Sequence, residues 1–270
     1  FDFPTVLIEK NLYSLELFHG PTMAFKDVGA KFMSGCMNYF IETENLKRKI
    51  TVLVATSGDT GGAVANGFLG VDGVDVIILY PKGRVSEIQE SQLTTLGKNV
   101  SALEIDGYFD ECQEMVKKSF LDSDLNKKLL LTSANSINIA RWIPQMLYYF
   151  IAYKNLNTEN LKVVFSVPSG NFGNLCAGML AKKMGLPVSH FIATTNENDT
   201  VPKFMKTGKY KKQKTISTIT NAMDVGDPSN FVRILNLYDN KFDKLKKELT
   251  AYKFTDKETI SGIQKLYHKS

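Results

Sequence analysis

Short apolar runs alternate with segments in which apolar residues recur every three or four positions along most of this 270-residue chain. The short runs are rich in β-branched residues and predict strands, whereas the longer periodic segments predict amphipathic helices. Strands are predicted at residues 5–8, 13–17, 51–55, 74–80, 100–105, 162–167 and 190–193. Helices are predicted at residues 21–40, 61–69, 86–96, 108–120, 139–153 and 175–184, and a helical pattern continues beyond residue 230. This strict alternation indicates an α/β protein with mostly parallel twisted sheets and helices on both faces.

The composition is that of an ordinary globular protein. Hydrophobic residues make up 43% of the chain and charged residues 23%, which suits the core of one large domain or two smaller ones. The formal net charge of +5 comes from scattered lysines, without the arginine-rich or aromatic-interleaved tract of a nucleic-acid binder. We therefore expect no nucleic-acid partner, and phosphorylated ligands explain the mild positive charge equally well.

The use of cysteine and histidine argues against disulfides and metal sites. Cys36, Cys112 and Cys176 are odd in number and widely separated, and the chain has no C-x-x-C or H-E-x-x-H pattern. This favours a reducing compartment and predicts no bound metal. The chain also lacks a membrane-spanning apolar run and a secretory leader pattern, so we expect a cytoplasmic protein with no membrane partner.

A buried strand that turns into a helix predicts a phosphate-binding site. The strand at residues 162–168 is followed by Ser-Gly-Asn-Phe-Gly-Asn at residues 169–174 and then by a helical pattern. The backbone N–H groups at a helix start lack intrahelical partners and, with the positive end of the helix dipole, attract phosphate. Gly170 and Gly173 allow a close approach of the main chain to a ligand. An ordinary strand-to-helix turn is the alternative interpretation of this motif alone.

A second loop, Thr-Ser-Gly-Asp-Thr-Gly-Gly-Ala at residues 56–63, follows the apolar strand at residues 51–55. A simple N-cap by Asp59 or Thr60 is the alternative interpretation. Three hydroxyl groups and three glycines exceed what a cap requires, so the loop is predicted to bind an anionic group of a substrate.

A lysine lies near the start of the first predicted helix. Lys26 follows Pro21 and is flanked by Phe25 and Val28. A lysine that lies along a helix face with its amine in water is the usual case. In a partly dry pocket, by contrast, desolvation lowers the pKa of the amine and makes it nucleophilic.

Together, an amine, an anion-binding loop and a phosphate site meet the needs of pyridoxal phosphate, whose aldehyde takes an amine and whose phosphate takes a helix start. The motifs at residues 15–27, 56–63 and 168–174 closely resemble those of threonine synthases, in the tryptophan synthase β-like (fold type II) group of pyridoxal phosphate enzymes. Further similar segments follow in order at residues 135–138, 144–145, 193–202 and 221–225. The resemblance implies a pyridoxal 5'-phosphate cofactor in a cleft between two α/β subdomains. It also implies that the smaller subdomain, residues 45–150 or so, is inserted in the larger.

The resemblance also implies site residues. Lys26 is the catalytic residue, which forms a Schiff base with the cofactor and moves protons. Cofactor contacts are implied for Ser169, Gly170, Asn171, Phe172, Gly173, Asn174 and Asp59. Substrate contacts are implied for Thr56, Ser57, Gly58, Asp59, Thr60, Asn135, Ser136, Asn138 and Arg141, with Lys82 and Arg84 as further candidates. A surface position on an amphipathic helix is the alternative for Arg141.

The implied reaction converts O-phospho-L-homoserine and water to L-threonine and phosphate. A phospholyase that eliminates phosphate from a related amino-phosphate, without completing the water addition, is the alternative. An inactive cofactor-binding core is a third possibility.

Two features of the family are missing from this sequence. Relatives carry a segment ahead of the motif that corresponds to residues 18–21, and a late hydroxyl residue that faces the pyridine nitrogen. Here the chain begins at Phe1, and Ser217, Thr218 and Thr220 are poor substitutes for the late residue. We therefore expect the N- and C-terminal parts of the family to be absent from this chain; its oligomeric state is not predicted.

Overall fold

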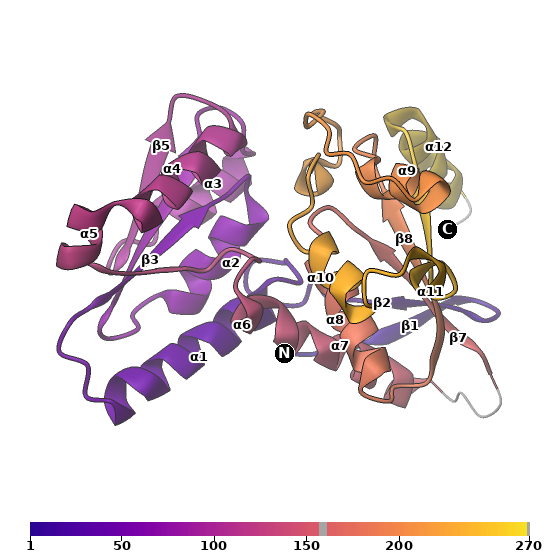
Figure 1. Cartoon of the computed structure of the whole chain (residues 1–270), viewed down its shortest axis with the longest axis horizontal. Coiled ribbons are helices and arrows are strands. Elements are labelled where there is room, and N and C mark those ends of the chain that lie inside the picture. The colour runs from indigo at the N-terminus through magenta and orange to yellow at the C-terminus, as the bar shows by residue number, and fades with distance from the viewer. Residues whose placement is uncertain (157–160, 269–270) are drawn as a thin grey trace. The chain divides into compact units, whose positions relative to one another are not determined.

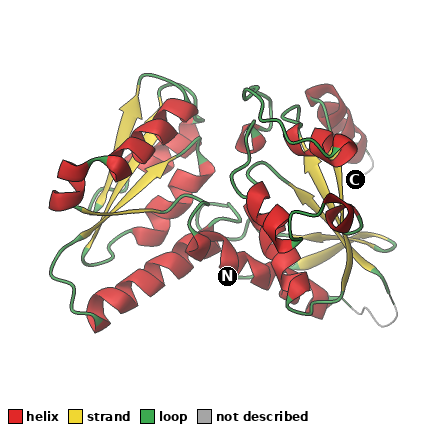
Figure 2. Cartoon of the chain, in the orientation of Figure 1, coloured by secondary structure: helices red, strands yellow, loops and turns green. Residues whose placement is uncertain are grey.

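The computed structural model describes residues 1–156 and 161–268, and residue contacts divide the chain into two units, Phe1–Gln145 and Met146–Ser270 (Figure 1). Each unit contains a parallel sheet with helices beside it (Figure 2). The predicted α/β class is confirmed. Residues 1–44 belong to the first unit, and a subdomain at residues 45–150 inserted in a larger one stays a prediction.

A four-stranded parallel sheet, in the order β5-β4-β3-β6, forms the centre of the first unit. Because the strands are parallel, the loops that follow them lie at one edge of the sheet. The sheet and its helices comprise α1 (Asp27–Thr43), β3 (Ile50–Ala55), α2 (Asp59–Phe68), β4 (Val74–Pro81), α3 (Glu87–Thr94), β5 (Val100–Ile105), α4 (Phe109–Leu121), α5 (Ser123–Lys128), β6 (Leu130–Ser133), α6 (Ile139–Trp142) and the short 3-10 helix η1 (Ile143–Gln145). An antiparallel pair, β1 (Thr5–Glu9) and β2 (Leu12–Leu15), precedes them.

The central strand β3 is buried on both faces. Val54 belongs to a core cluster with Phe68 of α2, and Leu53 belongs to a second cluster with Cys112 and Val116 of α4. Burial on both faces explains why this strand is a continuous apolar run in the sequence.

The second unit is built on the three-stranded parallel sheet β7-β8-β9, with β8 in the middle. Phe191 of β8 and Leu175 and Met179 of α8 are fully buried. The elements of this unit are α7 (Met146–Asn155), β7 (Val163–Pro168), α8 (Gly173–Lys183), β8 (Val188–Thr195), α9 (Thr200–Thr207), η2 (Asn221–Met223), α10 (Phe231–Leu237), α11 (Phe242–Lys246), β9 (Leu249–Lys253) and α12 (Asp256–Tyr267).

The first helix begins later than predicted. It starts at Asp27 rather than at residue 21, and Lys26 is its N-cap residue. The Asp27 carboxylate accepts hydrogen bonds from the N–H and the hydroxyl of Thr22, and Met23 adopts a positive φ of 55°. These local interactions hold residues 20–26 in turns, so the predicted start of this helix was wrong.

Two further predictions needed correction. The single helix predicted at residues 139–153 is interrupted by η1, because Pro144 lacks the N–H group that a continuous helix needs. Strand β9 lies in a Lys-rich segment that predicted a helix; it forms because Leu249 and Ala251 pair with Phe191 and Ala193 of β8.

Among the described helices, none is both long and apolar enough to cross a bilayer. The cytoplasmic location stays a prediction.

Candidate functional site

The side chain of Asn135 connects the last residue of β3 with the loop that follows β6. The Ala55 N–H donates to Asn135 Oδ1 at 3.1 Å, and Asn135 Nδ2 donates to the Ala55 carbonyl at 2.6 Å. The Ser133 hydroxyl also donates to Oδ1, at 3.2 Å. Asn135, itself a predicted substrate residue, is therefore bonded to the residue directly before the predicted loop at residues 56–63.

The amine of Lys26 lies beside a carboxylate at the start of α2. Lys26 Nζ is 3.6 Å from Asp59 Oδ2, and the two side chains are 20% and 30% exposed. Burial lowers the pKa of Lys26, the charge of Arg141 adds to that effect, and the charge of Asp59 opposes it. At a given pH, more of this amine is neutral and nucleophilic than in a lysine that extends into water.

Asp59 is held from a second side. Gln89 Nε2 of α3 donates to Asp59 Oδ1 at 2.7 Å, so each carboxylate oxygen faces a different partner. Asp59 is the first residue of α2 rather than its cap, and the helix dipole stabilises a negative charge there. The N-cap residue is Gly58, whose φ of 136° is one that L side chains rarely adopt.

The hydroxyl of Thr56 organises the loop between β3 and α2. It accepts hydrogen bonds from the N–H groups of Gly58 (2.9 Å) and Gly61 (2.8 Å) and donates to the Gly58 carbonyl (3.0 Å). Thr56 is buried, whereas Ser57 and Thr60 are half-buried. The hydroxyl of Thr56 thus shapes the loop, and contacts of these residues with substrate stay a prediction.

Arg141 is 2% exposed, so the alternative of a surface arginine is wrong. Its Nη1 donates to the Ala134 carbonyl at 2.5 Å. Arg141 lies on the short helix α6. Asn138 caps this helix through Oδ1, which accepts a hydrogen bond from the Ala140 N–H at 3.0 Å. Ser136 is half-buried in the same loop. These residues therefore surround the carboxyl end of β6, within the unit that contains Lys26.

The predicted phosphate segment lies in the second unit, where β7 turns into α8. Within the described part of the chain, the side chain of its N-cap residue Phe172 makes no capping hydrogen bond. The first turn, Gly173 to Leu175, carries no acidic residue, and the Cys176 N–H donates to the Phe172 carbonyl at 3.0 Å. The helix start is therefore electropositive, and the side chain of its N-cap residue does not cap it. By contrast, α3 and α12 are closed by the capping boxes of Ser86 and Thr255.

Neighbouring residues of the second unit fix this segment. The N–H and hydroxyl of Ser229 donate to Asn171 Oδ1, at 2.6 and 2.9 Å. A Cβ at Gly170 would lie 2.8 Å from Met223 Cα, so glycine is the residue that fits. On the other side, the Tyr149 hydroxyl donates to Asn174 Oδ1 at 2.6 Å.

Three residues that contact the predicted segments were not predicted as site residues: Gln89, Tyr149 and Ser229. Only Gln89 carries a local signal, because Ser-x-x-Gln at residues 86–89 is a capping-box pattern. Tyr149 and Ser229 contact the predicted phosphate segment through the fold, from positions 25 and 58 residues away.

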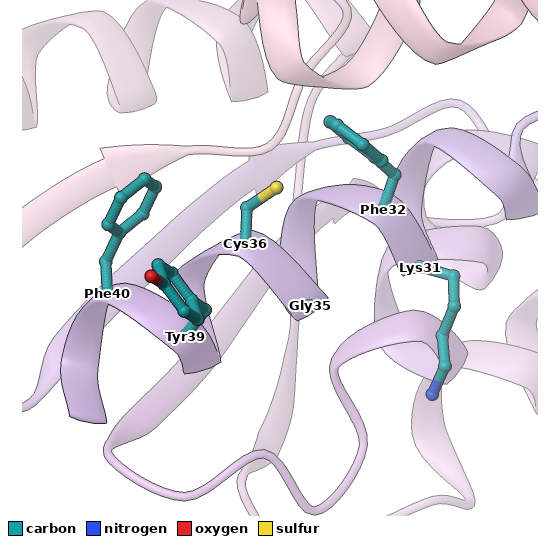
Figure 3. A pocket seen from close by; sticks show the side chains of 6 residues that line it. All are labelled: Lys31, Phe32, Gly35, Cys36, Tyr39 and Phe40. Atoms are coloured by element: carbon teal, nitrogen blue, oxygen red, sulfur yellow. The ribbon is translucent and has the colours of Figure 1, made fainter. Parts of the chain in front are cut away.

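A shallow apolar pocket lies elsewhere in the first unit. Figure 3 shows that its lining residues, among them Phe32, Cys36 and Tyr39, project from α1, and Lys26 and Asp59 are not part of it. Residues 1–156 and 161–268 contain no group of three or more His, Cys, Asp or Glu side chains that could hold a metal ion. The chemistry that the described residues offer is therefore an amine with a lowered pKa in one unit and an electropositive helix start in the other.

Comparison with known proteins gives matches along the whole chain. The sequence profile of the family described as "Pyridoxal-phosphate dependent enzyme" matches residues 7–270. The chain is 52% identical to the threonine synthase of Buchnera aphidicola over 242 residues, which is 89% of this chain and 56% of that protein.

Two solved structures have the same fold. The crystal structure of threonine synthase from Escherichia coli matches with a TM-score of 0.91 at 45% identity, over 99% of this chain and 62% of that one. The structure of threonine synthase with bound pyridoxal phosphate from Brucella melitensis matches with a TM-score of 0.86 at 38% identity, over 95% and 60%. The chain thus spans between 56% and 62% of the length of these three relatives.

Proposed function

We propose a function for this chain from one premise: it belongs to the family of pyridoxal-phosphate dependent enzymes. Lys26 binds the aldehyde of the cofactor, and residues 169–174 bind its phosphate. The residues fit this group because α8 begins without an acidic residue in its first turn and with an N-cap residue, Phe172, whose side chain makes no capping hydrogen bond. A glycine at position 170 keeps side-chain atoms away from the segment that would bind the phosphate, and burial lowers the pKa of Lys26. Asp59 is assigned to the ring hydroxyl of the cofactor.

The proposed reaction is that of threonine synthase: O-phospho-L-homoserine and water give L-threonine and phosphate. The observation that carries this proposal is the environment of Lys26, a partly buried amine 3.6 Å from a carboxylate, in a chain that closely resembles threonine synthases over nearly its full length.

The cofactor, when bound, supplies an electron sink for the electrons left at the substrate Cα. Lys26 Nζ takes the proton at Cα, gives that proton up and then takes one at Cβ, so that phosphate leaves from Cγ. The same amine returns its proton at Cγ, water adds its hydroxyl at Cβ, and Cα regains a proton. The proton left over from water goes to the phosphate. Its lowered pKa suits this work, because a base acts best when its pKa lies near the operating pH.

The other residues of the first unit bind and orient the substrate. Arg141 has a guanidinium suited to a phosphate group, and Ser136 contributes a hydroxyl. Asn135 and Asn138 hold their loop in place through Ala55 and α6. The loop at residues 56–60 binds the substrate carboxylate through its hydroxyl and N–H groups.

An assay with O-phospho-L-homoserine tests the proposed function. The chain, loaded with pyridoxal phosphate, should release phosphate and L-threonine in equal amounts. Phosphate with a 2-keto acid in place of threonine would identify the phospholyase instead. Cofactor binding without any phosphate release would leave only a binding core.

The substitution Asp59→Asn should lower the pKa of Lys26 further. It removes the negative charge that opposes the effect of burial, so the neutral amine persists to lower pH. The measurement is the rate at which pyridoxal phosphate labels Lys26 as a function of pH, trapped with borohydride and located by peptide mass spectrometry. The midpoint should move to lower pH. Asp75→Asn is the matched control, because Asp75 pairs with the exposed Lys49 at 3.2 Å in the same unit; an unchanged midpoint for Asp59→Asn contradicts the assignment.

A further inference from the structure

The side chain of Gln89 joins two loops of the first unit. Its Oε1 accepts from the Ser86 N–H at 3.1 Å, and its Nε2 donates to Asp59 Oδ1 at 2.7 Å. Rotating the amide by half a turn would place Gln89 Oε1 against Asp59 Oδ1 and Gln89 Nε2 against the Ser86 N–H. Both neighbours therefore require the same orientation of the amide. Gln89 is therefore fixed at one end by the capping box of α3 and bonded at the other end to Asp59.

The backbone at Gly58 leaves room for this side chain. A Cβ on Gly58 would collide with the amide of Gln89, and the φ of 136° at Gly58 is unfavourable for other residues. Gln89 is half-buried and held at both ends, so the bond to Asp59 does not require a freely moving side chain to become ordered.

We propose that Gln89 is a positioning residue: it holds Asp59 so that Oδ2 faces the amine of Lys26. A carboxylate with one oxygen fixed by a donor has few ways to turn, and the second oxygen then lies 3.6 Å from Lys26 Nζ. Without Gln89, Asp59 is free to adopt other rotamers, and its charge acts on Lys26 from a greater distance. This inference rests on the proposed role of Lys26 as the amine that binds the cofactor.

Among the charged groups near Lys26, Asp59 is the carboxylate whose charge raises the pKa of the amine. Arg141 of α6 acts in the opposite direction. Asp27, the neighbour of Lys26 on α1, accepts hydrogen bonds from the N–H and hydroxyl of Thr22. Glu90 of α3 lies within 3.4 Å of the Tyr80 hydroxyl. Asp59 is thus the carboxylate whose position relative to Lys26 is set by Gln89.

The test compares Gln89→Ala with Ser86→Ala. Each variant loses one hydrogen bond of the capping box, but only Gln89→Ala loses the bond to Asp59. The readout is the pH midpoint for labelling of Lys26 by pyridoxal phosphate in the cofactor-free chain. Gln89→Ala should move the midpoint in the same direction as Asp59→Asn and by less, with about a 1.4- to 5-fold faster rate below the midpoint.

The inference makes two predictions about the control variants, and three results would contradict it. Ser86→Ala should keep the midpoint of the unmodified chain, and the double variant of Gln89→Ala and Asp59→Asn should match Asp59→Asn alone. If Gln89→Ala leaves the midpoint unchanged while Asp59→Asn shifts it, the inference is wrong. If Ser86→Ala shifts it as much as Gln89→Ala, the effect comes from the cap of α3 and the inference is also wrong. If Lys26 of the unmodified chain is not labelled at all, the proposed function itself fails.

Discussion

Replacing Lys26 by alanine is expected to abolish the absorption band that forms when the chain binds pyridoxal phosphate. The band requires a bond between the aldehyde and an amine, and the amine we assign is the partly buried Lys26 Nζ beside Asp59. The same amine moves the protons at Cα and Cβ, so threonine formation should fall on the order of 10³-fold or more. Spectra and product assays of the two proteins, before and after borohydride reduction, provide the measurement.

Lys31→Ala is the matched control for this experiment. Lys31 is an exposed lysine on α1, five residues along the chain from Lys26, and its removal should leave the band and the activity in place. A band that survives in Lys26→Ala and can still be trapped by borohydride would show that another lysine binds the aldehyde.

Replacing Gly170 by alanine should weaken binding of the cofactor through its phosphate. The new Cβ would lie 2.8 Å from Met223 Cα and 3.1 Å from the Ala222 carbonyl oxygen. Because both are main-chain atoms, the loop must shift away from η2. If residues 169–174 are displaced, hydrogen bonds to the phosphate are lost. We therefore expect the dissociation constant of pyridoxal phosphate to rise about 10- to 100-fold, which corresponds to a loss of about 1.4–2.8 kcal/mol in binding free energy.

Two comparisons make this prediction specific. Labelling of Lys26 by pyridoxal, which lacks the phosphate, should proceed at the same rate in Gly170→Ala and in the unmodified chain. Gly262→Ala is the control for stability, since a Cβ there has no neighbour within 4 Å. Equal losses for pyridoxal and pyridoxal phosphate would point to general unfolding rather than to a phosphate site.

The sequence predicted most of the fold because its strongest signals are local. Continuous apolar runs such as residues 51–55 become buried strands, and the element type follows from the pattern alone. Strand β9 could not be recognised in this way, because its exposed Tyr252 and Lys253 and the surrounding lysines resemble a helical surface. Its extended form depends on pairing with β8, some 58 residues earlier in the chain.

Some residues of the candidate site could likewise be predicted from local sequence motifs, and others could not. The glycine-rich loops and Lys26 could be proposed as site residues from the sequence, because each belongs to a short motif whose residue types indicate its chemistry. The exact start of α1 could not, because the turns at residues 20–26 depend on how the Asp27 side chain binds Thr22. Gln89 and Ser229 escaped notice because each acts on a residue far away in sequence, Asp59 and Asn171 respectively.

Labelling of Lys26 in the unmodified chain tests the central claim most directly, namely that this amine and residues 169–174 serve one cofactor molecule. Pyridoxal phosphate and pyridoxal are compared at equal concentration, and the 75% exposed Lys127 in the same digest corrects for intrinsic reactivity. We predict that the phosphorylated compound labels Lys26 about tenfold faster or more, and that excess inorganic phosphate removes the difference. Equal rates for the two compounds, unaffected by phosphate, would contradict the account.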